Sequence, residues 1–261
     1  MARIFITGSA DGLGQLAARR LVALGHDVVL HGRNGDRAQQ ALRAVPGART
    51  ALEGDLASIE ATRALARQAN AAGPFQTVIH NAGVFGPSAA RRETVDGLDD
   101  VFAINALAPY LLTALIEGPQ RLIYLTSGLQ RSGDSDLRDL QWRRRRWNGL
   151  QAYANSKLFD VALAFAVARL WPHVLSNAVD PGWMPTKMGG PAATGDLEQG
   201  AATQVWLAVS DDRGAKVTGR YFHRMRTQAA HRAASDVTVQ NGFLATCEQL
   251  TGVPLPSVVT R

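Results

Sequence analysis

The chain has 261 residues, of which 46% are hydrophobic and 19% are charged, a balance typical of one packed globular protein with a sizeable core. Its net charge of +6 is compatible with nucleic acid, a membrane surface or a phosphorylated ligand as partner, because net charge concerns partners and not the fold. The single cysteine, Cys247, excludes an internal disulfide, and no spacing of Cys and His predicts a metal site.

Two features of the sequence argue against export or membrane insertion. The chain passes directly from Met1 into the strand-like residues 4–6, which leaves no room for a signal peptide. The longest apolar helical run, residues 161–171, is too short to cross a bilayer and contains Arg169. Since a lone cysteine also suits a reducing compartment, we expect a cytoplasmic protein without a membrane partner.

The first predicted strand, residues 3–7, runs into a glycine-rich turn and then into a helical pattern up to residue 24. Glycines in such a turn let the backbone approach a pyrophosphate, whose charge the helix N-terminus stabilises. The spacing here, Gly-x-x-x-Gly-x-Gly, differs by one residue from the commoner dinucleotide fingerprint, so a simple tight turn is the alternative interpretation. The candidate cofactor-binding residues of this turn are Gly8, Ser9, Asp11, Gly12, Leu13 and Gly14.

The end of the second predicted strand, residues 27–31, bears on the choice of cofactor. A carboxylate at this position would bind the ribose 2′-hydroxyl of NAD, but the chain has His31-Gly32-Arg33-Asn34. The guanidinium of Arg33 can instead pair with a 2′-phosphate. NADP(H) is therefore favoured over NAD(H), with Arg33 and Asn34 as candidate contacts. The alternative is that Arg33 is only an exposed loop cation.

The third predicted strand, residues 49–53, leads to Asp55 and Leu56, which are further candidates for the cofactor site. Asp55 is placed at a strand end, where it can accept a hydrogen bond from the adenine amino group. It can also cap the next predicted helix, residues 59–71, together with Ser58. Both roles are compatible with the sequence.

Two later predicted strands end in small or polar residues. Residues 76–80 lead to Asn81-Ala82-Gly83, where the ribose and nicotinamide of a cofactor would pass. Residues 120–125 lead to Ser127, which has the same position after its strand as Asn81. A serine in that position is often only part of a turn.

The stretch 99–117 between these strands has strong helical periodicity. Pro109 is expected to kink the helix, because proline lacks an N–H and clashes with the preceding turn. Asn105 lies inside the apolar pattern, where a side-chain amide needs a hydrogen-bond partner.

The helix-forming run 150–170 contains Tyr153 and Lys157, which a spacing of four residues places on one face, one turn apart. A cation at that distance lowers the cost of forming phenolate, which makes Tyr153 usable as a proton donor or acceptor near neutral pH. Tyr-x-x-x-Lys also occurs by chance in many helices, where a buried Tyr beside a solvated Lys is the ordinary interpretation. The meaning of the pair therefore depends on the other motifs.

A sixth predicted strand, residues 174–179, is followed by Pro181 and Gly182, which would lie beside the nicotinamide. Thr186 can bond the nicotinamide carboxamide or a phosphate, and simple turn formation is the alternative. The segment 183–200, rich in Gly, Pro and Ala, is predicted to be a substrate lid. A helix over 197–209, a strand over 219–222 and a helix over 235–250 complete the predicted elements.

Together these residues resemble the short-chain dehydrogenase/reductase family, whose motifs they match in order over roughly residues 3–190. The matching motifs are Thr7-Gly8-x-x-x-Gly12-x-Gly14, Asn81-Ala82-Gly83, Asn105, Ser127, Tyr153-x-x-x-Lys157 and Pro181-Gly182. The resemblance implies an α/β fold, with a single Rossmann-type domain over residues 1–261, a doubly wound parallel sheet of about seven strands and helices on both faces. Residues 31–34 and 54–58 are similar to the branch that contains retinol dehydrogenases and related NADP-linked reductases.

The resemblance also implies four catalytic residues for hydride transfer between NADP(H) and a carbonyl compound or its alcohol. Tyr153 would donate or accept the proton, and Ser127 would hydrogen-bond the reacting oxygen. Lys157 would bind the nicotinamide ribose and favour phenolate, so Tyr153 and Lys157 also count as cofactor-binding residues. Asn105 would hold a water that resupplies protons.

Two positions depart from the family pattern. His80 replaces an Asn that often precedes Asn81, and the interval from Ser127 to Tyr153 is longer than in many members. The extra residues, 131–149, are expected near the substrate entrance. They include Arg143 to Arg146, interpreted as a solvated loop rather than a nucleic-acid site because repeated basic and aromatic alternation is missing.

The predicted partner is a small hydrophobic aldehyde, ketone or alcohol. Candidates for an apolar substrate wall are Leu129, Trp147, Trp183, Met184 and Met188, with core packing as the alternative. In the family, the helix equivalent to 150–170 commonly packs against a partner subunit, so a homodimer or homotetramer is expected. A regulator that binds NADP without turnover is the remaining alternative, and the presence of Tyr153 and Lys157 argues against it.

Overall fold

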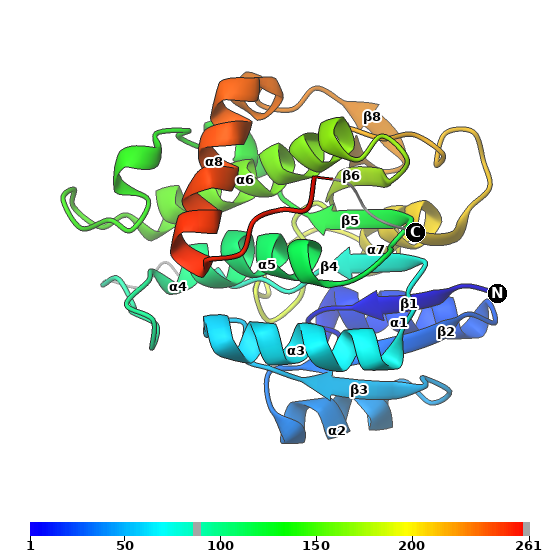
Figure 1. Cartoon of the computed structure of the whole chain (residues 1–261). Helices are drawn as coiled ribbons and strands as arrows, with labels where there is room; N and C mark the ends of the chain where they lie inside the picture. Colours follow the sequence, from blue (N-terminus) through cyan, green and yellow to red (C-terminus); the bar gives the residue numbers. More distant parts are fainter. Residues whose placement is uncertain (86–89, 258–261) are drawn as a thin grey trace.

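The computed structural model describes residues 1–85 and 90–257. At its centre lies one sheet in the order β3-β2-β1-β4-β5-β6-β7-β8, with helices on both faces (Figure 1). All neighbouring strands are parallel except β7 and β8, which form an antiparallel hairpin. The predicted doubly wound α/β fold is therefore confirmed, with β8 added at the edge. The strands are β1 (Arg3–Ile6), β2 (Asp27–Gly32), β3 (Thr50–Glu53), β4 (Thr77–His80), β5 (Arg121–Leu125), β6 (Leu175–Asp180), β7 (Arg220–His223) and β8 (Arg226–Gln228).

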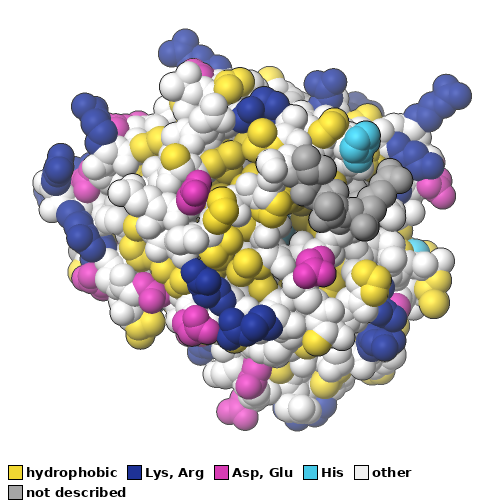
Figure 2. All heavy atoms as spheres, in the orientation of Figure 1, with side chains coloured by type: hydrophobic (Ala, Val, Ile, Leu, Met, Phe, Trp, Pro, Cys, Tyr) yellow, Lys and Arg dark blue, Asp and Glu magenta, His cyan; other side chains and the backbone are white. Residues whose placement is uncertain are grey.

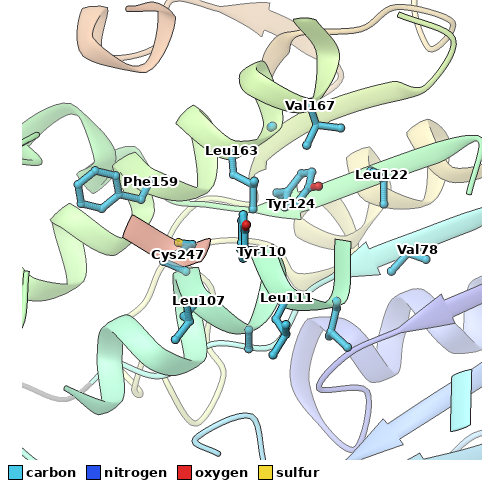
Figure 3. Close-up of a cluster of buried hydrophobic side chains, with 14 of the residues drawn as sticks. Val78, Leu107, Tyr110, Leu111, Leu122, Tyr124, Phe159, Leu163, Val167 and Cys247 are labelled. Atoms are coloured by element: carbon cyan, nitrogen blue, oxygen red, sulfur yellow. The ribbon is translucent and has the colours of Figure 1, made fainter. Parts of the chain in front are cut away.

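Both faces of the sheet are buried because side chains alternate along each strand. In β1, Phe5 faces one hydrophobic cluster, whereas Ile4 and Ile6 face the other. The first face is covered by α3 (Ile59–Ala72), α5 (Ala108–Leu115), α6 (Gly149–Leu170) and α8 (Val237–Thr251), and Figure 3 shows part of this cluster. The second face is covered by α1 (Gly12–Ala23), α2 (Gly35–Ala44) and α7 (Leu197–Val209).

The strand order reverses at β1, which has β2 on one side and β4 on the other. The connection after β1 leads to β2 on one side, and the connection after β4 leads to β5 on the other. Because these two connections run in opposite directions, a crevice opens between the carboxyl ends of β1 and β4. The residues predicted to bind a cofactor follow β1, β2, β3 and β4, so the topology gathers them at this edge.

The stretch predicted as one kinked helix, 99–117, has three segments: α4 (Asp100–Phe102), a π-helical turn η1 (Ala103–Leu107) and α5. Pro109 lies in the first turn of α5, and the departure from α-helical geometry comes before it, in η1. Because proline has no N–H, it cannot donate to the carbonyl of Asn105 four residues earlier. The π-helical turn therefore includes Asn105, the polar residue that the sequence placed inside the apolar pattern.

The catalytic-helix candidate α6 is enclosed by its own chain. Leu150 and Arg169 are its only exposed residues. The ring of Phe243 on α8 stacks on Phe159 with centroids 4.9 Å apart, and in Figure 1 α8 (red) lies across α6. The surface on which the expected contact with a partner subunit depended is thus covered by α8, and the homo-oligomer remains a prediction. Within the described residues, no helix is long and apolar enough to traverse a bilayer.

Candidate active site

A cavity of about 970 Å³ opens at the carboxyl ends of the strands. Its walls come from the glycine-rich turn after β1, the loops after β2 to β6, and the first turns of α6. It thus extends from the predicted phosphate site at Gly12 to the predicted catalytic residues Ser127, Tyr153 and Lys157, all of which line it. A cavity of this size exceeds what water alone requires and suits a cofactor together with a small ligand.

The glycine-rich turn fits close backbone packing at two points. Gly8 has a φ of +62°, and a Cβ there would lie 2.8 Å from the Cα of Ala82. A Cβ on Gly14 would lie 2.3 Å from the Nδ2 of Asn81, so glycine lets α1 approach the end of β4. Gly8, Asp11, Gly12 and Leu13 line the cavity; Ser9 and Gly14 are not among its lining residues. The turn therefore provides an open cradle beside the N-terminus of α1, which fits a pyrophosphate.

His31, which had no assigned role in the sequence, connects three strand ends. Its Nδ1 accepts a 3.0 Å hydrogen bond from Gly8 N, and its Nε2 lies 2.9 Å from Gly54 O. Ser9 accepts from His31 N at 2.8 Å and donates to Ile6 O at 3.0 Å. Burial lowers the pKa of His31 to about 4, so the imidazole is neutral and can accept the bond from Gly8. Hydrogen bonds of Ser9 and His31 thus fix the backbone of the glycine-rich turn.

The loop after β2 brings a second arginine to the cavity. Arg33 is exposed and lines the cavity, whereas Asn34 caps α2 by accepting from Arg37 N at 3.0 Å. Arg37 also lines the cavity, and its Nη2 lies 2.6 Å from Asp11 Oδ2. Arg37 was not singled out from the sequence, although a basic residue one helical turn after Arg33 is a signal that could have found it.

Asp11 is held between two cations. Lys187 Nζ lies 3.1 Å from the Asp11 oxygen that Arg37 also contacts. Burial raises the pKa of Asp11, but the hydrogen bonds and charges of Arg37 and Lys187 outweigh it and lower the pKa below its ordinary value. Asp11 is therefore ionised at neutral pH.

Asp55 and Leu56 both line the cavity. The Oδ1 of Asp55 accepts a 3.0 Å hydrogen bond from Ala57 N, and Ser58 caps α3 by accepting from Ala61 N at 3.3 Å. Asp55 therefore faces the cavity while it also orders the turn before α3. The carboxylate retains lone pairs for a ligand donor.

At the other end of the cavity, Tyr153 and Lys157 lie side by side on α6. Lys157 Nζ is 5.8 Å from the centre of the Tyr153 ring. The same nitrogen donates to Leu125 O and to Asp160 Oδ2, each at 2.8 Å. Asp160 was not identified from the sequence, where it has the appearance of one polar residue in an apolar helix.

The electrostatics of this group depend on burial and on the lysine. Burial raises the pKa of Tyr153, while the charge of Lys157 and the hydroxyl of Ser127 act in the opposite direction. The predicted influence of Lys157 thus has the expected sign, although burial outweighs it. Burial lowers the pKa of Lys157, but the charge and hydrogen bond of Asp160, together with Tyr153, outweigh it, so the pKa of the ammonium is raised. A charged lysine therefore faces a neutral phenol.

Asn105 is fully buried and its side chain is engaged by the loop after β4. Its Oδ1 accepts from Val84 N at 2.8 Å, and its Nδ2 donates to Val84 O at 2.9 Å and to Ser156 Oγ at 3.0 Å. A Cβ on Gly83 would lie 3.3 Å from that Oδ1 and 3.6 Å from Lys157 Nζ. Asn105 is not among the cavity-lining residues, so its side chain fixes the adjoining loop, and its water-holding role remains a prediction.

The apolar wall differs slightly from the predicted one. Leu129, Trp183, Met184 and Met188 line the cavity, whereas Trp147 packs edge-to-face on Trp142. Phe85 and Ile104 were not predicted and also line it. The Phe85 ring meets the Tyr153 ring at 4.7 Å in a T-shaped contact. This wall suits an apolar ligand next to the phenol.

The segment predicted as a lid lies against the glycine-rich turn. The side chain of Thr186 comes within 3.5 Å of the position that a Cβ on Gly12 would take. Trp183 donates through Nε1 to Gly189 O at 2.9 Å, and Gly182, with a φ of +88°, donates its N–H to Asp180 Oδ1. Pro181, Gly182 and Thr186 all line the cavity, and their contacts with a nicotinamide remain a prediction. Closure of this segment over a ligand remains a prediction.

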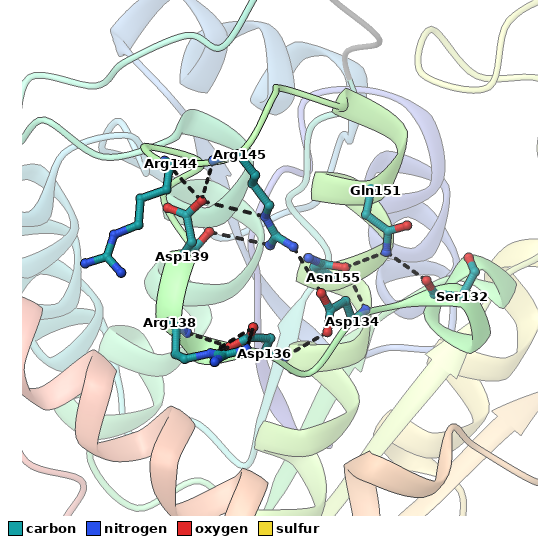
Figure 4. A network of polar contacts seen from close by, with 9 residues as sticks. All are labelled: Ser132, Asp134, Asp136, Arg138, Asp139, Arg144, Arg145, Gln151 and Asn155. Carbon is teal, nitrogen blue, oxygen red and sulfur yellow. Dashed lines mark hydrogen bonds and ion pairs between the residues drawn. The ribbon is translucent and has the colours of Figure 1, made fainter.

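The insertion 131–149 folds onto itself and onto α6 (Figure 4). Arg145 pairs with Asp134 at 3.0 Å and lies 4.0 Å above the Trp142 ring. Asp134 N donates to Asn155 Oδ1 at 2.7 Å. Among the described residues, the cavity lining stops at Leu129 and resumes at Tyr153, so the insertion does not form its wall.

Basic side chains are scattered around the face shown in Figure 2 rather than gathered in one stripe. Two of the four arginines at 143–146 make side-chain contacts within the chain. Arg145 contacts Asp134 and the Trp142 ring, and Arg143 donates to Gly97 O at 2.9 Å. These internal contacts agree with the interpretation of this run as part of a loop.

Comparison with known proteins gives the family. The short chain dehydrogenase family matches residues 2–117. The chain is 44% identical to an uncharacterized oxidoreductase of Emericella nidulans and 40% identical to a short-chain dehydrogenase of Gibberella zeae, over 98% of this chain and 99% and 100% of those proteins. Retinol dehydrogenase 13 of Homo sapiens is 28% identical over 98% of this chain and 86% of its own length.

A solved structure agrees with this relationship. The crystal structure of an uncharacterized protein from Mycobacterium paratuberculosis superposes with a TM-score of 0.83 and 26% identity, covering 98% of this chain and 95% of the other. The predicted resemblance, including the likeness to retinol dehydrogenases, is thus confirmed. With the glycine-rich cradle, the Tyr153 and Lys157 pair and relatives of this similarity along the whole chain, the protein belongs to the short-chain dehydrogenase family of oxidoreductases.

Proposed function

We propose that the protein is an NADP(H)-dependent oxidoreductase that interconverts a hydrophobic ketone or aldehyde and its alcohol. The observation that carries this proposal is the position of Tyr153 and Lys157 in the wall of the same cavity that begins at the glycine-rich turn. One end of the cavity can hold a dinucleotide and the other can donate a proton beside an apolar wall. Such a combination suits carbonyl reduction.

The residues around the cavity fit NADP(H). Gly8 and Gly12 provide backbone access for the pyrophosphate, and Asp55 and Leu56 would contact the adenine. Arg33 and Arg37 would pair with the 2′-phosphate, because guanidinium groups match phosphate geometry and remain charged. Asn81, Ala82, Gly83 and Lys157 would contact the ribose beside the nicotinamide, with Pro181, Gly182 and Thr186 opposite. The bound cofactor would supply or accept the hydride.

Tyr153 is the proposed general acid and base. Its hydroxyl would transfer a proton to the carbonyl oxygen in reduction, or remove it from the alcohol in oxidation. Ser127 would hydrogen-bond the same oxygen as charge develops on it. The ammonium of Lys157, 5.8 Å from the ring centre, stabilises the phenolate that Tyr153 becomes after proton transfer. The roles proposed for Tyr153, Ser127 and Lys157 require no metal ion.

The substrate site is proposed to be the apolar part of the cavity. Phe85, Leu129, Trp183, Met184 and Met188 present aromatic and aliphatic surface beside Tyr153. Burial of such surface favours an apolar substrate by about 25 cal/mol per Å². A hydrophobic ketone or aldehyde whose carbonyl reaches Tyr153 and Ser127 would fit this arrangement.

The deciding experiment is a panel of hydrophobic aldehydes and ketones assayed with NADPH and with NADH by loss of nicotinamide absorbance. Turnover with NADPH is expected. Tyr153→Phe should lower kcat by about 10²- to 10⁴-fold while leaving NADPH binding in place, since the ring is kept and the proton donor is lost. Turnover by Tyr153→Phe at the rate of the unmodified protein would contradict the proposed function. Binding of NADPH with no turnover of any carbonyl would favour the regulator alternative.

A further inference from the structure

A buried carboxylate lies beside the proposed catalytic lysine and has no part in the reaction described so far. Asp160 follows Lys157 by three positions on α6, and its Oδ2 accepts a 2.8 Å hydrogen bond from Lys157 Nζ. The two side chains are only 5% and 3% exposed, for Lys157 and Asp160 respectively. Opposite charges are thus held together where water does not screen them.

The contacts of Lys157 determine where its ammonium points. An ammonium has three N–H donors, of which one reaches Leu125 O at the carboxyl end of β5 and a second reaches Asp160. Because Lys157 also lines the cavity, the third donor is left for the cavity side. Removing one of the two fixed acceptors would free the ammonium to rotate away from that direction.

Asp160 also accounts for the charge of the lysine. Burial lowers the pKa of Lys157, and the Asp160 carboxylate raises it again. Other titratable groups around the pair are Tyr153 on α6, Tyr124 on β5 and Asp180 at the end of β6. Among the described residues, Asp160 is the one that forms an ion pair with Lys157. Without it, the buried ammonium would lack an adjacent anion.

We propose that Asp160 is a positioning residue of the active site, which holds the Lys157 ammonium charged and directed toward Tyr153 and the cofactor site. This inference rests on the proposed function, in which Lys157 binds the cofactor ribose and stabilises the phenolate. Asp160 touches none of the reacting atoms and acts only through Lys157. A merely structural ion pair would stabilise α6 and keep Lys157 charged without changing the reaction.

The first test observes Lys157 directly. The sequence contains three lysines, Lys157, Lys187 and Lys216, so isotopic labelling of lysine side chains gives three NMR signals, assigned with Lys187→Arg and Lys216→Arg. In the full chain, the Lys157 signal should keep its charged position to a higher pH than the two signals from exposed side chains. In Asp160→Asn it should change to the neutral form at least about one pH unit earlier than in the unmodified protein. An identical Lys157 titration in both proteins overturns the proposal.

The second test measures turnover with NADPH and an accepted carbonyl substrate. Asp160→Asn keeps the side-chain shape and removes the charge, and it should lower kcat/KM about tenfold or more. Asp99→Asn is the matched control, because Asp99 is another buried carboxylate, 1% exposed, that caps α4 through Phe102 N. It should retain the activity of the unmodified protein. Full activity in a folded Asp160→Asn protein overturns the proposal.

A double-mutant cycle shows whether Asp160 acts through Lys157. If it does, Lys157→Met and the double variant Lys157→Met/Asp160→Asn should have equal activity, because the second change removes nothing further. Losses that add up would contradict the proposal. If Asp160→Asn does not fold, the Lys157 titration of the unmodified protein decides, and a Lys157 that titrates with the exposed lysines overturns the proposal.

The outcome for Tyr153 separates this inference from the function on which it rests. An active Tyr153→Phe protein means that the proposed function is wrong. An inactive Tyr153→Phe protein, combined with a fully active Asp160→Asn protein, means that only the role of Asp160 is wrong.

Discussion

Arg37 donates a 2.6 Å hydrogen bond to the carboxylate of Asp11, which joins the first turn of α2 to the glycine-rich turn. Lys187 reaches the same carboxylate oxygen from the segment after β6. Arg33 precedes Arg37 by one helical turn and has no acidic partner among the ion pairs of the described residues. A phosphate bound here would therefore find an Arg33 guanidinium without an ion-pair partner and an Arg37 guanidinium already oriented by Asp11.

This arrangement predicts the cofactor preference. Arg33→Ala and Arg37→Ala should each weaken NADPH binding by about tenfold or more and leave NADH binding nearly unchanged, because a hydrogen bond to a charged group contributes about 1.5–3 kcal/mol. Calorimetric titration with both dinucleotides measures the difference. Arg43→Ala, in the last turn of α2, is the matched control and should bind both as before. Equal losses for NADPH and NADH would contradict the assignment of NADP.

A second prediction concerns the packing of the glycine-rich turn. In Gly14→Ala, the new Cβ would lie 2.5 Å from Gly8 O in addition to its clash with Asn81, so the backbone must shift. We expect a loss of about 1–3 kcal/mol in the free energy of unfolding and weaker NADPH binding. Gly25→Asn is the control, since nothing lies within 4 Å of its Cβ and Asn tolerates a positive φ. Urea unfolding of a Gly14→Ala protein as stable as the unmodified one would show that the turn can adjust.

A third prediction follows from the burial of His80, the residue that departs from the family pattern. Burial lowers its pKa to about 3, so the folded state keeps it neutral while the unfolded state binds a proton near pH 6.5. The neutral His80 therefore contributes to the free energy of unfolding fully above pH 6.5. This contribution, up to about 5 kcal/mol, is lost as the pH falls toward 3.

His80→Phe tests this acid sensitivity. The ring of His80 stacks on Tyr124 with centroids 4.8 Å apart, and Phe keeps the ring without the titration. The difference in unfolding free energy between pH 7 and pH 5 should be smaller than in the unmodified protein, measured by urea denaturation. His173→Gln, at an exposed position, should leave the pH dependence as it was. A slope unaffected by His80→Phe would locate the acid sensitivity in another group, such as the buried His31.

A fourth prediction addresses the cover over α6. Phe159 and Phe243 are fully buried and stacked, with their ring planes 7° apart. Phe243→Ala should lower the free energy of unfolding by about 3–5 kcal/mol, because it leaves a cavity between α6 and α8. Phe243→Leu should cost less, since more of the volume is kept. Thermal and urea denaturation measure both losses, and a negligible loss in Phe243→Ala would mean that α8 does not stabilise α6.

Much of the fold was predictable because its signals are local. Alternating strands and helices, the glycine-rich turn and Pro181-Gly182 lie close to where the pattern placed them, and most boundaries differ by no more than two residues. The hairpin that adds β8 was missed, since Arg224 and Met225 take positive φ values of 50° and 58° without the Asn-Gly signal typical of such turns. The π-helical turn was missed because hydrophobic periodicity does not distinguish it from an α-helix.

The parts of the site that escaped prediction depend on tertiary contacts. Asp160 acquires its importance only when α6 packs on the end of β5 and shuts water away from Lys157. Arg37 becomes relevant only when β1 and β2 pair and bring Asp11 within its reach. Asp160 follows Lys157 by three positions and Arg37 follows Arg33 by four, but these spacings report neither the burial of Lys157 nor the contact with Asp11. The raised pKa of Tyr153 likewise follows from burial, which the helical spacing of Tyr153 and Lys157 does not report.

The C-terminal segment has a consequence beyond packing. Tyr110 on α5 donates to Val253 O at 2.7 Å, and Trp171 at the end of α6 donates to Pro256 O at 2.8 Å. These bonds and α8 complete the surroundings of α6, which carries Tyr153 and Lys157, from within one molecule. The 5.8 Å between the Lys157 ammonium and the centre of the Tyr153 ring is thus held by contacts within a single chain, and we expect dilution to leave it unchanged.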